Sequence, residues 1–143
     1  MAARACTVHR LVADVAAVSG GKVLLVRYRD ATKYDGQKGW FLPDDFLNFD
    51  EHPADAAVRI LREQAGISTE SPTLGHLESF AGGPSGAWHL IFHYKAELAR
   101  APRVRPGANV ASADWFPTAR LPPKKEIAHG GWAADVLRVL FPE

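Results

Sequence analysis

The sequence contains one cysteine, no excess of either charge and no long hydrophobic run, and each shortage excludes a class of protein. Cys6 alone can form neither an internal disulfide nor a cysteine-based zinc site, so we expect a reducing, cytoplasmic setting. The 17 Lys and Arg residues against 16 Asp and Glu leave a net charge of +1, without the basic excess of proteins that bind nucleic acid through its phosphates. We therefore expect no nucleic-acid partner and favour small molecules or proteins.

No stretch approaches the roughly 18 apolar residues that a membrane-spanning helix needs, so no membrane role is expected. Asp14 interrupts the apolar N-terminal stretch, which argues against a secretory signal. The chain of 143 residues is 47% hydrophobic, which suits one hydrophobic core and makes a second improbable. A single domain over residues 1–143 is the prediction.

The first part of the chain has the composition of β-strands. Two runs rich in Val, Ala and Leu, residues 7–19 and 22–29, flank a Gly-Gly pair, which predicts a β-hairpin. A short strand is expected over Trp40–Leu42, closed by Pro43. An acidic, irregular stretch is expected over residues 44–51.

A helix is predicted from Pro53, a residue that suits the first helical position. Asp55 lies in the first turn, at the positive end of the helix dipole, and Gly66 supplies the stop. Between them apolar residues recur at helical spacing: Ala56, Ala57, Ile60, Leu61 and Ala65.

Beyond this helix, strands are expected over residues 74–80, 88–98 and 113–116, with a surface loop over 100–107. A C-terminal helix is expected from one apolar face, formed by Trp132, Val136, Leu137 and Leu140. Strands, one helix, more strands and a terminal helix indicate a mixed α/β layered domain, not a regular βαβ alternation.

Residues 45–67, which join the acidic loop to the predicted helix, follow a spaced pattern. The matching residues are Glu51, Arg59, Leu61, Glu63, Gly66 and Ile67. In this spacing the segment resembles the Nudix box of the Nudix hydrolase superfamily (MutT-like), Gly-x5-Glu-x7-Arg-Glu-U-x-Glu-Glu-x-Gly-U, where U is a bulky aliphatic residue. The resemblance extends less specifically to the flanking strands and implies an α/β fold, the Nudix-type α/β/α sandwich with a mixed β-sheet.

The segment departs from the box at three positions, with Asp45 for the glycine, Ile60 for the first helix glutamate and Gln64 for the last. In family members, glutamates at these helix positions and at 63 share one face and hold magnesium or manganese. These ions support hydrolysis of the pyrophosphate bond in a nucleoside diphosphate linked to another moiety. Here only Glu63 remains as candidate metal ligand and catalytic residue. The resemblance thus implies a degenerate box with hydrolysis weak or lost.

Other parts of the box are kept. By resemblance, Glu51 and Arg59 tie the loop to the helix through an ion pair, and Gly66 ends the helix. Asp44 and Asp45 stand where the family typically has Gly-Gly, and with Glu63 they could form a displaced metal site. The alternative, which we favour, is that both are loop acids that tolerate unusual backbone angles.

Substrate contacts are expected at Arg27, which could meet an anionic ligand, and at Trp40, which could stack on a base. Solvent contact for the arginine and core packing for the tryptophan are the alternatives. His76, His89 and His93 could form a metal cluster, but half-buried or surface histidines are the favoured interpretation.

Three functions stay open at this point. The first is a hydrolase that uses Glu63 with substitutes for the missing ligands, and Mg²⁺ or Mn²⁺ as cofactor. The second is a non-catalytic module that binds a nucleotide-type ligand, and the third is a protein-interaction module on the same fold. A homodimer is a further open possibility, and the sequence does not identify the substrate.

Overall fold

The computed structural model describes residues 9–83 and 86–142. Cys6 and the first two residues of the strand predicted from Thr7 lie outside the described residues. None of the helices in the described ranges is long and apolar enough to cross a membrane.

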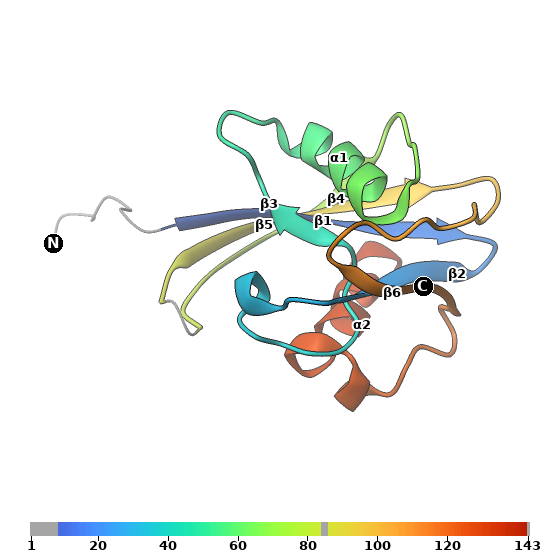
Figure 1. Cartoon of the computed structure of the whole chain (residues 1–143). Coiled ribbons are helices and arrows are strands. Elements are labelled where there is room, and N and C mark those ends of the chain that lie inside the picture. Colours follow the sequence, from blue (N-terminus) through green and yellow to red (C-terminus); the bar gives the residue numbers. More distant parts are fainter. Residues whose placement is uncertain (1–8, 84–85, 143) are drawn as a thin grey trace, which may run out of the picture.

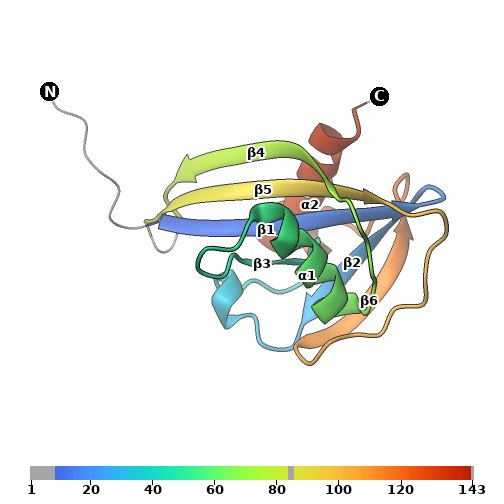
Figure 2. The same ribbon diagram turned by 90° about the horizontal axis from the view of Figure 1, so that it is seen from above.

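Six strands form one mixed sheet, in the order β4-β5-β1-β2-β6, with β3 paired to β1 beside this path (Figure 2). The strands are β1 (His9–Ser19), β2 (Lys22–Tyr28), β3 (Asp44–Phe46), β4 (Thr73–Ala81), β5 (Trp88–Glu97) and β6 (Val110–Pro117). β1 runs parallel to β5, whereas the other pairs are antiparallel. The predicted hairpin between β1 and β2 is confirmed.

β1 changes partner along one of its edges. Its last two residues pair with β2, and Val12–Asp14 pair with β3. This corrects the prediction for residues 40–51, because the strand forms at Asp44–Phe46, where an irregular stretch was expected. Trp40 and Phe41 make only isolated bridges, to Ile127 and Val26. Aspartate is depleted in strands, so the composition of residues 44–46 did not predict a strand. The strand forms because these residues pair with β1.

The helix α1 (Pro53–Ala65) confirms the predicted boundaries. Its N-cap is His52, whose Nδ1 accepts a hydrogen bond of 3.0 Å from the backbone N–H of Ala54. Gly66 ends the helix in a left-handed conformation, with φ of 67°, and its N–H donates to the carbonyl of Arg62.

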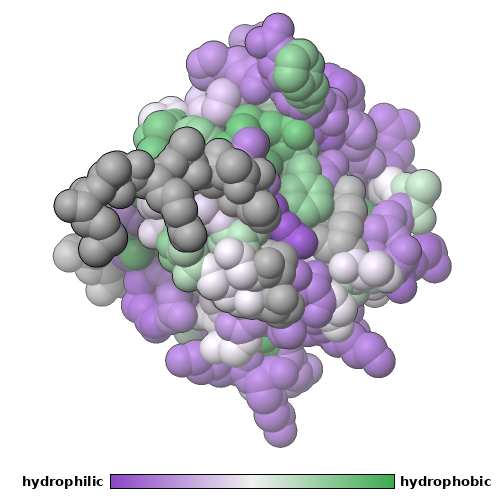
Figure 3. Space-filling model, turned by 90° about the vertical axis from the view of Figure 1, so that its left-hand side faces the viewer, coloured by the Kyte–Doolittle hydropathy of each residue, from purple (hydrophilic) through white to green (hydrophobic). Residues whose placement is uncertain are grey.

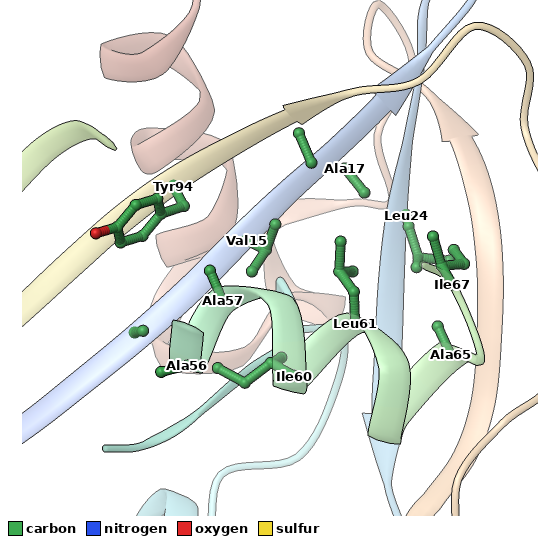
Figure 4. Packing of buried hydrophobic residues seen from close by; sticks show 12 residues of the cluster. Val15, Ala17, Leu24, Ala56, Ala57, Ile60, Leu61, Ala65, Ile67 and Tyr94 are labelled. Carbon is green, nitrogen blue, oxygen red and sulfur yellow. The ribbon is translucent and has the colours of Figure 1, made fainter. Parts of the chain in front are cut away.

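The two helices cover opposite faces of the sheet (Figure 1). α1 buries its predicted apolar residues against Val15, Ala17 and Leu24 (Figure 4). Each large aliphatic side chain buried in this way contributes roughly 1.5–3 kcal/mol. The result is the mixed α/β fold that the resemblance implied.

α2 (Ala128–Leu140) begins irregularly, because His129, Gly130 and Gly131 have positive φ values and interrupt the helical geometry. Regular helix follows from about Trp132, where the apolar pattern predicted it. Two short 3-10 helices, η1 (Thr32–Tyr34) and η2 (Lys124–Glu126), lie in the connections before β3 and α2.

Candidate functional site

Arg59 on α1 is the centre of the box segment. Its Nε lies 2.9 Å from Oε2 of Glu51, and its Nη2 lies 3.1 Å from Oε1 of the same carboxylate. Nη2 also donates to the carbonyl of Phe46, at 3.0 Å. The hydrogen bond from Arg59 lowers the pKa of Glu51, and the carboxylate in turn raises the pKa of the guanidinium. The bidentate ion pair therefore fixes the acidic loop to the helix.

The remaining nitrogen of this guanidinium binds two of the acids that the sequence offered as metal ligands. Nη1 of Arg59 lies 3.2 Å from Oδ2 of Asp45 and 3.1 Å from Oε1 of Glu63. The side chain of Glu63 is 51% exposed, whereas that of Arg59 is 13% exposed. One cation thus contacts three carboxylates, and its charge offsets part of theirs.

The other two helix positions of the family's metal face have taken different roles. Ile60 is fully buried and packs in the core beneath α1 (Figure 4). Gln64 donates from Nε2 to the carbonyl of Asp44 at 2.8 Å, and its Oε1 accepts from the hydroxyl of Tyr28 at 2.8 Å. The amide nitrogen and the amide oxygen of Gln64 therefore join α1 to β3 and β2.

These residues do not fit a divalent cation. Magnesium and manganese need several oxygen ligands, with carboxylates among them. In the part of the chain that the structure describes, no group of three or more His, Cys, Asp or Glu residues could hold a metal ion. Asp44 and Asp45 lie in β3, not in an irregular loop, and neither has a positive φ, so the loop-acid alternative is wrong. The displaced metal site formed by Asp44, Asp45 and Glu63 stays a prediction.

A cavity of about 300 Å³ lies beside the box segment. Among its lining residues are Arg10, Asp45, Glu78, Phe80, His89 and Trp132. Phe80 is also one of the large apolar side chains that are exposed, at 40%. Figure 3 shows an apolar area among hydrophilic side chains on the side of the molecule where β1 begins.

Three rows of side chains cross the sheet beneath this cavity; the first two line it, and the third reaches it through Asp44. The first runs from Phe80 through His89 to Arg10, the second from Glu78 through Ile91 and Val12 to Phe46, and the third from His76 through His93 and Asp14 to Asp44. Residues two apart in a strand share a face, so all three rows lie on one side of the sheet. The cavity and the box segment therefore meet at β3.

A cluster of titratable side chains joins the second and third rows. Nδ1 of His93 lies 2.8 Å from both carboxylate oxygens of Asp14, and its Nε2 lies 2.9 Å from Oε1 of Glu78. Burial by itself lowers the pKa of His93, but the hydrogen bonds and charges of Asp14 and Glu78 outweigh it and raise that pKa. Burial raises the pKa of Asp14, against the opposing effect of His93. Each ring nitrogen of His93 thus faces a carboxylate oxygen, an arrangement that favours the protonated imidazole.

The family assignment rests on a match to most of the chain and not on the box alone. A family model described as the NUDIX domain matches residues 8–136. The chain belongs to the Nudix family. The resemblance found from residues 45–67 is thereby confirmed.

Solved Nudix structures share this fold at low identity. A MutT NUDIX hydrolase from Burkholderia pseudomallei is 22% identical, with a TM-score of 0.76 over 93% of this chain and 98% of that one. The NUDIX domain of Shewanella oneidensis NrtR, complexed with ADP ribose, is 19% identical, with a TM-score of 0.71 over 91% and 86%. A Caenorhabditis elegans Ap4A hydrolase is 19% identical, with a TM-score of 0.69 over 91% and 93%. Among curated proteins no sequence gives a significant match.

Arg27 and Trp40, the two residues that the sequence suggested as substrate contacts, are not among the residues that line this cavity. Trp40 is 8% exposed and packs edge-on against Phe116, with 4.8 Å between ring centroids. The guanidinium of Arg27 lies 4.3 Å from the centroid of the Trp40 indole, as a cation–π pair. Substrate contact by Arg27 and Trp40 therefore stays a prediction.

The histidines follow the favoured interpretation in part. The exposed His76 stacks on His93 at 5.9 Å, and the buried His89 stacks on Phe80 at 4.6 Å. His93, however, is almost fully buried between the carboxylates of Asp14 and Glu78, a role that the sequence interpretation missed. The available signal was Asp14, an acid inside an otherwise apolar strand, which needs a buried partner.

Proposed function

We propose that this Nudix chain binds a nucleotide-type ligand, a nucleoside diphosphate linked to another moiety, and that its metal-dependent hydrolysis is weak or lost. The weak or lost hydrolysis is inferred from the guanidinium of Arg59, which binds the carboxylates of Glu51, Asp45 and Glu63. The helix face that should hold the ion offers one partly exposed carboxylate, a core side chain and an amide engaged on both sides.

The ligand class is supported by two similar structures and by the cavity. The Shewanella NUDIX domain is complexed with ADP ribose, and the Caenorhabditis protein is an Ap4A hydrolase. The cavity of about 300 Å³ borders the box segment and combines apolar walls with a few polar groups, as small-molecule sites do. A cytoplasmic location and a homodimer stay predictions.

The test is a hydrolysis panel with ADP-ribose and Ap4A in magnesium and in manganese. We expect little turnover by the wild type and a gain when carboxylates are restored, by Gln64→Glu and by the double variant Ile60→Glu with Gln64→Glu. Because position 60 is buried, circular dichroism must first show that the double variant is folded. Equal turnover by wild type and double variant would show that the substitutions do not disable the site. Melting temperatures with each ligand test binding separately, because a bound ligand stabilises the folded state.

Two further variants make the result interpretable. Gln64→Glu alone avoids placing a charge in the core and keeps the acceptor for Tyr28, but it removes the donor to the carbonyl of Asp44. We expect it to fold even if the double variant does not. Glu63→Gln removes the last carboxylate of the helix face, and Glu70→Gln on the exposed surface is its matched control. Loss of turnover in Glu63→Gln alone would assign any residual hydrolysis to the box.

A further inference from the structure

The cavity is acidic and contains few cations. Its lining includes four carboxylates, from Asp35, Asp44, Asp45 and Glu78, and one arginine, Arg10. Nη1 of that arginine lies 3.4 Å from Oδ1 of Asp35, so its charge is already shared. Such a lining repels phosphate and favours a ligand group that presents N–H donors.

Glu78 is a lining carboxylate that a buried histidine holds in place. Its Oε1 accepts from Nε2 of His93, and His93 is held from the other side by Asp14. The ring of Trp132 lies 5.6 Å from that of His93, which adds packing to the hydrogen bonds. The side chain of Glu78 is 34% exposed, whereas those of His93 and Asp14 are 1% and 0% exposed. A buried pair thus orients an accessible acceptor.

The floor beside this acceptor suits a flat ring. Glu78 shares its row with Ile91 and Val12, two apolar side chains that also line the cavity. The stacked pair of Phe80 and His89 belongs to the neighbouring row. A ring lying over the aliphatic floor would therefore have its edge, not its face, toward the carboxylate.

Resting on the proposed binding of a nucleotide, we propose that Glu78 is the specificity-determining acceptor of the cavity and selects a base with a ring N–H beside an exocyclic amino group. A carboxylate only accepts hydrogen bonds, and its two oxygens can take two parallel donors. Guanine presents that pair of donors on one edge. Hypoxanthine lacks the amino group, and adenine places an acceptor nitrogen beside its amino group, so each loses at least one contact.

The test compares the 5′-monophosphates of guanosine, inosine and adenosine, which carry the same phosphate and differ in the base edge. Binding to the intact chain is measured by NMR titration at fixed salt, without metal. We expect the guanosine nucleotide to bind about tenfold more tightly than the other two, the difference that one bidentate contact supplies. Glu78→Gln should remove this preference because its amide presents a donor, whereas the exposed Glu97→Gln on β5 should keep it.

The outcomes separate the two proposals. If ADP-ribose or Ap4A binds but the three monophosphates bind equally, Glu78 does not select the base and the proposed function stands. Unchanged preference in Glu78→Gln would also overturn the role of Glu78. If none of these nucleotides binds, both proposals are wrong. The comparison among ligands uses the wild type, so it holds even if a variant fails to fold.

Discussion

Nδ1 of His93 lies 2.8 Å from both carboxylate oxygens of Asp14, and both side chains are buried in the sheet. An ion pair buried in this way costs stability when one member is removed, because the other is left as an uncompensated charge. The stability of the sheet should therefore depend on the presence of both side chains.

Replacing His93 by Gln should lower the free energy of unfolding by about 3 kcal/mol, because Asp14 then keeps its burial without a cationic partner. Urea unfolding followed by circular dichroism measures the change. His76→Gln is the matched control, since His76 is exposed and only stacks on His93, and it should cost much less. Equal losses in the two variants would contradict a special role for the buried pair.

Stability should depend on pH through the same residue. Because the folded state raises the pKa of His93, its contribution is complete below the ordinary value of 6.5 and is lost as pH rises through the folded value. Burial lowers the pKa of His129, which works in the opposite direction, so the wild type must be compared with His93→Gln. The difference between their unfolding free energies should shrink as pH rises above 6.5. A constant difference would argue against a charged His93.

Ile60→Glu should be strongly destabilising. The side chain is fully buried among apolar neighbours, so the variant loses aliphatic packing and buries a carboxyl group in its place. We expect a loss of about 3 kcal/mol or more, against about 1 kcal/mol for the control Ile60→Val, measured by denaturant unfolding. A small loss in Ile60→Glu would mean that the helix can turn this position toward the solvent.

Gly107→Ala should disturb the packing of the loop after β5 against the end of α1. A Cβ atom at Gly107 would lie 2.0 Å from the carbonyl oxygen of Glu63, which is backbone and cannot move aside. We expect a loss of about 2 kcal/mol, typical of overpacking, in thermal or urea unfolding. At Gly75 the added Cβ would meet the flexible side chain of Leu140, so Gly75→Ala is the milder control.

The local parts of the fold were predictable from the sequence. Pro53 and Gly66 set the limits of α1, and the Gly-Gly pair placed the first hairpin, because these signals act within a few residues. β3 was missed because its pairing with β1 depends on residues 32 or so positions away, not on its own acidic composition.

The site was predictable only where the box motif covers it. The pairing of Glu51 with Arg59 followed from the motif, but the contacts of Arg59 with Asp45 and Glu63 did not. Spacing placed Ile60 on the face of Glu63, yet its apolar side chain turns to the core. Asp14 and His93 are 79 residues apart, so only the register of β1 against β5 brings them together.

β1 has hydrogen-bonded neighbours along both edges, with β5 on one side and with β2 and β3 on the other. Its eleven residues carry part of the cavity floor and also anchor the strand to which Gln64 of the box helix is tied. The cavity and the box helix therefore share a single central strand. We expect the backbone amides of β1 and its neighbours to be protected from hydrogen exchange as one cooperative unit.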